Sequence, residues 1–219
     1  MPTLGYWKIR GLAAGIRMQM IYQGVEYDLA EYEQGDGPEF SRDAWYSVKP
    51  TMGLDFPNLP YFINGDFRIT ETVAIHKYIA DKWNPEVLGT TPEERARVNM
   101  LHGVILDFKN AVTRPCYTSG NRDEIIPIIQ EKLPAIVNFL GENQFLAGNN
   151  VTWVDFFFFE FVNAMRFIHE GLFAEFPSIE AYHARMSDLP RLKEYLADPN
   201  SLDNNRTFNN KVAKLNNIV

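Results

Sequence analysis

Cysteine and histidine are the side chains from which nucleophilic, redox or zinc chemistry usually starts, and this chain of 219 residues contains few of either. The single cysteine, Cys116, excludes an intrachain disulfide. No Lys, His or helix N-terminus is evidently placed to lower the pKa of its thiol, which favours a buried or spectator thiol over a reactive one. The four histidines are far apart in sequence, and no pair has the H-E-x-x-H spacing of a zinc site. We therefore expect packing or surface histidines and no bound metal.

Motifs that bind phosphate or activate a serine are also absent from the sequence. It contains no G-x-G-x-x-G, no G-x-x-x-x-G-K-[ST] and no G-x-S-x-G. A surface that neutralises nucleic-acid phosphates needs surplus Lys and Arg, whereas this chain has a formal net charge of -7 and no basic run. We therefore expect no nucleic-acid partner.

The longest apolar stretch, Val151 to Ile168, carries Asp155, Glu160 and Arg166, and a helix that spans a bilayer would not tolerate three charges in that length. The N-terminus lacks the apolar run of a signal peptide. A single cysteine also fits a reducing compartment. We therefore expect a cytoplasmic protein with no membrane partner.

Strand and helix patterns alternate over the first third of the chain. Asn64-Gly65, between Tyr61–Ile63 and Phe67–Ile69, predicts a hairpin with a type I′ turn, because that turn requires positive φ at both central positions. The predicted elements are strands over 3–7 and 27–32, a helix over 13–23 that stops at Gly24, a loop over 34–38, this hairpin, and a helix over 71–83. Their β-α-β, β-β-α order matches a thioredoxin-like α+β domain at residues 1–83.

Strand patterns disappear after residue 84, where Asn84-Pro85 begins a predicted linker over 84–90. Thr91 then caps a predicted helix, and Glu94 closes its capping box. Further helices are predicted over 123–140 (kinked or split at Pro134), from a capping box at Thr152–Asp155, over 179–186 and over 191–196. The polar tail from Asp198 is expected to lie over the surface. Residues 91–219 are thus predicted to form an all-α helical bundle.

The helix that follows Thr91 is apolar on two faces. One stripe holds Val98, Leu101, Ile105, Phe108 and Val112, and a second, small and mostly uncharged stripe holds Met100, Gly103, Val104, Asp107 and Ala111. A helix of this kind usually packs against two neighbours, and a second subunit is a candidate for one of them.

The end of the first strand is where a thioredoxin-like domain that exchanges disulfides carries Cys-x-x-Cys. Here the sequence reads Gly5-Tyr6-Trp7-Lys8, which excludes dithiol exchange by this chain. Tyr6 would lie at the carboxyl edge of the sheet, where open sheets place their ligands. Taken alone, Tyr6 is better interpreted as a core or rim aromatic.

Five segments carry a resemblance to a known family: GYWKIRGL at 5–12, QGDGP at 34–38, GLDFPNLPY at 53–61, ITET at 69–72 and AGNNVTWVDF at 147–156. Together they closely resemble cytosolic glutathione transferases of the mu class. The similarity covers nearly the whole chain and weakens after Ser201. It implies a homodimeric detoxification enzyme that takes glutathione as cosubstrate and conjugates its sulfur to small hydrophobic electrophiles.

The resemblance gives Tyr6 a catalytic role. A thiol has a pKa of roughly 8.5, so only a small fraction is ionised at neutral pH. Lowering that pKa by about two units requires about 2.7 kcal/mol of preferential stabilisation of the thiolate. One hydrogen bond donated by a hydroxyl to the sulfur can supply stabilisation of that order.

The resemblance also implies where glutathione binds: Tyr6, Trp7, Arg42, Trp45, Lys49, Asn58, Leu59, Pro60, Glu71, Thr72 and, from the neighbouring subunit, Asp107. Trp45 and Lys49 would hold the glycine carboxylate. The Leu59 backbone, before a cis Pro60, would pair with the cysteine backbone. Thr72 would bind the γ-glutamyl carboxylate at a helix N-terminus, where the dipole favours an anion. Taken alone, Lys49 fits a solvated lysine, Trp45 a lid over the core, and Glu71 a first-turn carboxylate.

The family pattern further implies an electrophile pocket and a dimer contact. The pocket residues would be Ile9, Leu12, Ala111, Tyr117 and Phe208, with Tyr117 as a second tyrosine that assists certain electrophiles. Phe56 matches an aromatic that fills a pocket on the partner subunit.

This chain departs from the family pattern in a few places. Glu71-Thr72 replaces the usual Gln-Ser, two residues are inserted before Thr91, and the tail lacks the usual pocket-closing aromatic, with Leu215 as the nearest apolar substitute. Two alternatives to the transferase stay open: a ligand-binding protein with little or no turnover, and a glutathione-dependent isomerase on the same fold.

Overall fold

The N-terminal part of the protein is built on a four-stranded sheet with strand order β2-β1-β3-β4. A computed structural model describes residues 1–217, so the last two residues of the predicted helical domain lie outside the described residues. The strands are β1 (Thr3–Trp7), β2 (Asp28–Tyr32), β3 (Tyr61–Asn64) and β4 (Phe67–Thr70). β1 pairs with β2 in parallel and with β3 antiparallel.

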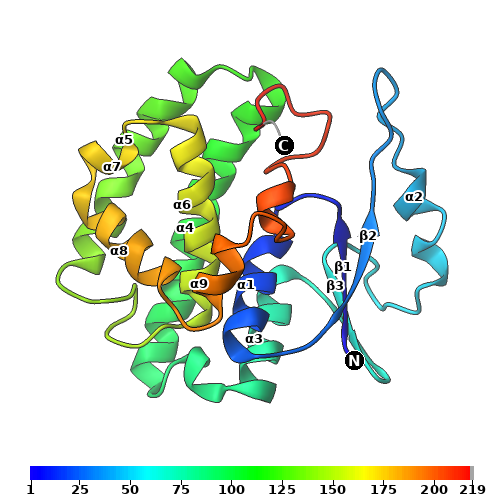
Figure 1. The fold of residues 1–219 in the computed structure, drawn as a ribbon, viewed down its shortest axis with the longest axis horizontal. Coiled ribbons are helices and arrows are strands. Elements are labelled where there is room, and N and C mark those ends of the chain that lie inside the picture. The colour runs from blue at the N-terminus through cyan, green and yellow to red at the C-terminus, as the bar shows by residue number, and fades with distance from the viewer. Residues whose placement is uncertain (218–219) are drawn as a thin grey trace.

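Helix α1 (Ala13–Gln23) connects β1 to β2 and packs on both halves of the molecule. Ile16 and Met20 are buried against the sheet, while Ala14 and Met18 belong to the core of the helical half. The helix ends as predicted at Gly24, whose φ of 68° is a left-handed conformation that suits glycine. In Figure 1, α1 and α3 (Thr72–Trp83) lie between the sheet and the helices that follow α3 in the chain.

The β3–β4 hairpin forms where it was predicted, but its turn is different. Asn64 pairs with Phe67, so Gly65 and Asp66 are the two turn residues rather than Asn64 and Gly65. Gly65 has a φ of 62°, and neither Asn64 nor Asp66 has a positive φ. This excludes the predicted type I′ turn and matches type II′, which needs glycine only at its first central position.

All secondary-structure elements that follow β4 in the described chain are helices, which confirms the predicted fold class. A short α2 (Asp43–Tyr46) and the 3₁₀ helices η1 (Lys49–Thr51) and η2 (Pro85–Leu88) precede them, and η3 (Asp203–Asn205) lies in the tail. The main helices are α4 (Pro92–Thr118), α5 (Arg122–Leu140), α6 (Trp153–Ile168), α7 (Leu172–Glu175), α8 (Pro177–Ser187) and α9 (Leu192–Ala197).

Two predicted details of these helices need correction. Thr91 caps α4 as predicted, because its hydroxyl accepts a hydrogen bond from the Glu94 N–H at 3.1 Å. The Glu94 carboxylate accepts from the backbone N–H of Thr90 at 2.6 Å, and not from that of Thr91 as the predicted capping box requires. α5 is continuous through Pro134, which excludes the split that was predicted as the alternative to a kink. The capping box at the start of α6 is confirmed: Asp155 accepts from both the N–H and the hydroxyl of Thr152, each at 2.8 Å.

The tail does more than cover the surface, contrary to the prediction. Asp203 is only 1% exposed and forms a buried ion pair with Arg17 of α1. A buried carboxylate is stable only with a partner. The partner of Asp203 is 186 residues away in the sequence, so the polar composition of the tail gave no sign that Asp203 is buried.

Among residues 1–217, no helix combines the length and apolar character that a membrane crossing requires. The same residues contain no group of three or more His, Cys, Asp or Glu side chains arranged to hold a metal ion.

Candidate active site

Tyr6 lies on β1 with its hydroxyl turned toward the loop that follows the strand. The side chain is 7% exposed, and its hydroxyl oxygen accepts a hydrogen bond from the Leu12 N–H at 3.1 Å. Burial raises the pKa of Tyr6 to about 12, so the phenol keeps its proton at neutral pH. Because the Leu12 N–H occupies the oxygen as an acceptor, the hydroxyl proton is free to be donated to a ligand.

The Tyr6 hydroxyl occupies the space that a side chain at position 11 would fill, and Gly11 has none. A Cβ at this position would lie 2.6 Å from the Tyr6 oxygen, and the φ of Gly11 is 46°. Both the close approach and the backbone conformation require glycine here. The loop 9–12 is therefore shaped around the tyrosine hydroxyl.

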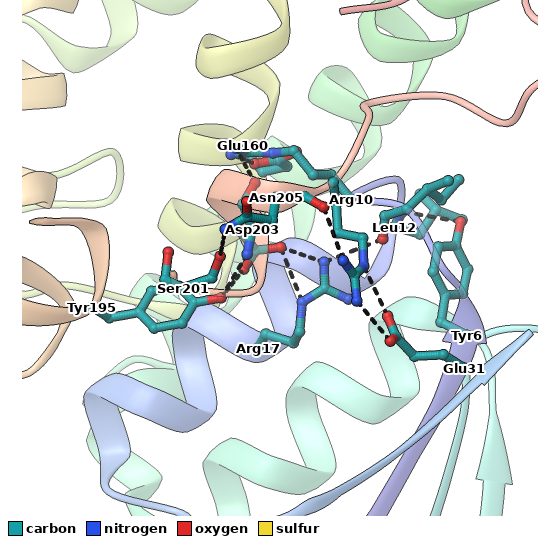
Figure 2. Close-up of polar contacts among 12 residues, drawn as sticks. Tyr6, Arg10, Leu12, Arg17, Glu31, Glu160, Tyr195, Ser201, Asp203 and Asn205 are labelled. Carbon is teal, nitrogen blue, oxygen red and sulfur yellow. Dashed lines mark hydrogen bonds and ion pairs between the residues drawn. The ribbon is translucent and has the colours of Figure 1, made fainter. Parts of the chain in front are cut away.

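Buried ion pairs fix this loop against the helical half of the molecule (Figure 2). Arg10 donates from Nε and Nη2 to the two oxygens of Glu160 on α6, at 2.9 and 2.5 Å, and from Nη1 to the Asp203 carbonyl at 3.0 Å. Arg17 pairs with the Asp203 carboxylate, which also accepts from the Tyr195 hydroxyl at 2.7 Å. Burial raises the pKa of Glu160, and the Arg10 guanidinium opposes that rise.

The tail also binds the loop through its backbone. The Arg10 N–H donates to the Thr207 carbonyl at 2.8 Å, and the Gly11 N–H donates to the Phe208 carbonyl at 3.2 Å. The Phe208 ring lies 4.7 Å from the Arg10 guanidinium carbon. The surroundings of Tyr6 are thus assembled from β1, α6 and the C-terminal tail.

A polar groove of about 270 Å³ has Trp7, the last residue of β1, in its lining, whereas Tyr6 is not among its lining residues. Most of the predicted glutathione contacts line it, together with residues that sequence reasoning missed. The predicted ones are Trp7, Arg42, Trp45, Lys49, Asn58 and Leu59, and the others are Gln34, Tyr46, Asn210 and Val212. Tyr117, which was predicted for the electrophile pocket, also lines this groove. Two cations and several hydrogen-bond donors suit an anionic, extended ligand.

Trp45 and the segment around Pro60 give the groove a rigid floor. Trp45 is buried, with its ring 6.0 Å from that of Tyr61 in a stacked arrangement. The Leu59–Pro60 peptide is cis, as predicted, and the Leu59 N–H donates to Asn58 Oδ1 at 2.9 Å.

Glu71 and Thr72 lie at the N-terminus of α3, beyond the groove lining. The Asn58 amide donates to the Glu71 carboxylate at 3.4 Å, which connects Glu71 to the groove. The φ of Glu71 is 73°, an unfavourable conformation for a residue with a side chain. Such strain is concentrated at functional sites, where the surrounding structure imposes it.

A second, narrow pocket of about 30 Å³ has Gly11 in its lining. Its walls come mainly from α4, α6 and the tail. They include Gly11, Lys109, Thr113, Cys116, Glu160 and Phe208. Ile9 is buried and Leu12 is half-buried beside Tyr6. Burial raises the pKa of the Tyr117 hydroxyl, which accepts from the Asn210 N–H at 3.1 Å.

Asp107 and Ala111 lie apart from both of these cavities. They line a depression of about 480 Å³ between α4 and α5, with Val104. The role of Asp107 in the site of a neighbouring subunit stays a prediction. Ala111 was predicted in the electrophile pocket and does not line the pocket beside Gly11, because the α4 face that reaches that pocket carries Lys109, Thr113 and Cys116.

The contacts that sequence reasoning missed are mostly long-range charges. One signal was present: Glu160 and Asp155 interrupt a Phe-rich helix, and charges in such a helix require buried partners. Their identity was not accessible, since Arg10 lies 150 residues before Glu160. The fate of Cys116 matches the expected buried thiol, whose pKa is raised by burial.

Comparisons with known proteins agree with this geometry. The family model "Glutathione S-transferase, N-terminal domain" matches residues 2–81, and "Glutathione S-transferase, C-terminal domain" matches residues 107–199. The chain is 39% identical over 201 residues to a class-mu 26 kDa glutathione S-transferase of Fasciola hepatica, covering 90% of this chain and 88% of that protein. It is 37% identical to glutathione S-transferase Mu 5 of Rattus norvegicus, over 98% of this chain and 95% of the relative.

A solved structure gives the same picture. The glutathione S-transferase Blo t 8 superposes with a TM-score of 0.86 at 30% identity, covering 97% of this chain and 99% of that chain.

Proposed function

Since the chain belongs to the glutathione S-transferase family, and to its mu class, we propose that Tyr6 stabilises the glutathione thiolate for attack on hydrophobic electrophiles. The observation that carries this proposal is the Tyr6 hydroxyl itself. It is buried, protonated at neutral pH, and already accepts the Leu12 N–H, so its own proton is available for the sulfur. A charge-assisted hydrogen bond in such a dry site is worth about 1.5–3 kcal/mol.

Glutathione occupies the polar groove in this proposal. Arg42 and Lys49 take up the glycine carboxylate, with the Trp45 indole N–H as a further donor and Trp7 beside them. Leu59, before the cis Pro60, presents its backbone to the cysteine residue. The helix N-terminus at Thr72 receives the γ-glutamyl carboxylate, because the first N–H groups of α3 lack intrahelical partners.

The ammonium of the γ-glutamyl group is held by acidic residues. Glu71 is next to the groove through its contact with Asn58, and Asp107 is supplied by the partner subunit. The electrophile lies against Tyr6 on the side of Ile9, Leu12, Tyr117 and Phe208. Ala111 leaves this set, because its helix face belongs to the depression between α4 and α5.

The exposed apolar residues support a homodimer. Phe56 is 79% exposed at the tip of its loop, and Met100 and Val104 of the second α4 stripe are also exposed. We assign Phe56 to a contact with the partner subunit. The division into domains at 1–83 and 91–219, with a linker at 84–90, is kept, since α3 ends at Trp83 and α4 begins at Pro92. We further propose that the protein is cytoplasmic.

The test compares wild-type protein with Tyr6→Phe in the conjugation of 1-chloro-2,4-dinitrobenzene over a range of pH. Removing the hydroxyl is expected to lower kcat/KM at neutral pH roughly 100-fold, which corresponds to the ~2.7 kcal/mol needed to shift a thiol pKa by two units. The difference is expected to narrow as pH rises toward the pKa of the free thiol. Full activity of Tyr6→Phe at every pH would show that the thiolate role of Tyr6 is wrong.

The same conjugation assay separates the transferase from the first alternative, and an isomerisation assay addresses the second. A ligand-binding protein would bind glutathione without turnover, and an isomerase would turn over substrates that release no leaving group. The protonated, donor-ready hydroxyl of Tyr6 favours the transferase, because thiolate stabilisation would serve no purpose in a protein that only binds.

A further inference from the structure

The narrow pocket beside Gly11 contains a charge that its apolar walls do not explain. Phe161, Phe167 and Phe208 supply aromatic walls, and α4 contributes Lys109. Gly11 lines the pocket, and the Tyr6 hydroxyl occupies the space at its missing Cβ, so the pocket and the hydroxyl both border Gly11. An electrophile held at Tyr6 therefore lies next to this pocket.

The Lys109 ammonium has no direct bonding partner, although the Glu160 carboxylate lies near enough to act on it through its charge. Within residues 1–217, the ammonium makes no hydrogen bond or ion pair that satisfies ordinary distance limits. The acidic group that shares the pocket is Glu160, and both of its oxygens are bound to Arg10. Lys109 is half-buried, and burial lowers its pKa, while the charge of Glu160 opposes that shift.

The size of the pocket limits what can pair with Lys109. A volume of about 30 Å³ accommodates roughly two water molecules. That is the space of a carboxylate or a similarly small anion and is too small for an aromatic ring. The ring of an electrophile would stay beside Tyr6, and only a substituent would enter the pocket.

We propose that Lys109 is a specificity-determining residue that binds a carboxylate carried by the electrophile, so that this enzyme prefers anionic over neutral electrophiles. The proposal rests on the proposed function, because it requires the electrophile to lie at Tyr6. The two carboxylates of glutathione are not the expected partners, since Arg42, Lys49 and the α3 N-terminus serve them in the separate polar groove.

A matched pair of aryl chlorides tests this assignment: 4-chloro-3-nitrobenzoate and its methyl ester. In both, the thiolate sulfur forms a bond to the ring carbon, the carbon–chlorine bond breaks, and chloride leaves with its electron pair. The two substrates differ in charge at the far end of the ring, and the ester is also bulkier and more electron-withdrawing. Comparing the ratio of kcat/KM for the acid to kcat/KM for the ester between variants cancels the intrinsic difference in reactivity and leaves the contribution of Lys109.

Lys109→Met is expected to lower this ratio roughly tenfold, equivalent to about 1.4 kcal/mol, mainly through the KM of the acid. Lys109→Arg is expected to restore most of the ratio because it keeps the cation. The control Lys193→Met removes an exposed lysine, paired with Asp188 at 2.8 Å on the surface, and is expected to leave the ratio unchanged. An acid-to-ester ratio in Lys109→Met within twofold of wild type would overturn the proposal.

Binding of the two glutathione conjugates, measured by calorimetry, separates this proposal from the proposed function. Wild-type protein that binds the acid conjugate more tightly than the ester conjugate, with the difference lost in Lys109→Met, supports Lys109 as the anion site. Equal binding of both conjugates to wild type refutes the Lys109 assignment alone. Failure to bind either conjugate refutes the proposed glutathione site, and the Lys109 assignment with it.

Discussion

The protein uses arginine and lysine in opposite ways on the two sides of Tyr6. At the junction between the sheet and the helical half, Arg10 and Arg17 are buried and fully paired with Glu160 and Asp203. In the polar groove, Arg42 is exposed and Lys49 is half-buried, and neither forms an ion pair among residues 1–217. In a buried ion pair the two charges compensate each other and stabilise the fold. A cation without an ion-pair partner is available to bind a ligand. The difference separates residues that position Tyr6 from residues that bind glutathione.

The largest expected effect comes from breaking a buried pair at the junction. Asp203→Asn leaves the Arg17 guanidinium, which is 1% exposed, without its counter-charge. Removing one partner of a buried pair costs about 3–5 kcal/mol, because the remaining charge stays buried and uncompensated. We expect a loss of this size in the free energy of unfolding measured with urea.

Glu33→Gln provides the matched control for Asp203→Asn. Glu33 forms exposed ion pairs with Lys8 and Lys211, and such pairs contribute at most about 1 kcal/mol. The Glu33→Gln effect is expected to fade in high salt, while that of Asp203→Asn persists. Similar losses for the two variants would contradict the distinction between a structural junction and a solvated surface.

This contrast also shows what the sequence could predict. β1, α1 and the capping box of α6 depend on local spacing, so their positions were predicted to within a residue or two. Tyr6 and the groove residues were reached only through the resemblance, since Tyr6 alone was better interpreted as packing. The junction pairs were not predicted, because Arg17 and Asp203 meet only after the tail folds back on α1.

The junction should also make the fold acid-sensitive through His76 of α3. His76 is fully buried, its ring lies 5.6 Å from that of Trp153 on α6, and burial lowers its pKa to about 3. Unfolded histidine titrates near pH 6.5, so the unfolded state binds an extra proton between pH 6.5 and about 3, and stability must fall as pH decreases through that window. At pH 5 the expected loss from His76 is about 2 kcal/mol relative to pH 7.

His76→Asn tests this expectation. Asn lacks the titrating group but keeps an amide that can contact Gln19, which is the His76 Nδ1 partner. The variant is expected to be less stable at pH 7, because it leaves a cavity, and to lose less stability than wild type between pH 7 and pH 5. Comparing the two proteins cancels the opposite contribution of Asp155, whose pKa is raised by burial to about 6. Parallel curves of unfolding free energy against pH would exclude His76 as the acid-sensitive group.

The smallest expected effect concerns the cations of the polar groove. Lys49 lies 5.6 Å from the Tyr46 ring centroid and is otherwise unpaired among the described residues 1–217. Lys49→Met therefore removes a charge that the folded protein does not need for its own stability. We expect the KM for glutathione to rise roughly tenfold, or about 1.4 kcal/mol, with kcat at saturating glutathione and the free energy of unfolding nearly unchanged. Lys82→Met, at the far end of α3, serves as the control for loss of one positive charge. A drop in unfolding free energy comparable to that of Asp203→Asn would place Lys49 among the structural charges, and the groove would then lose its principal contact for the glycine carboxylate.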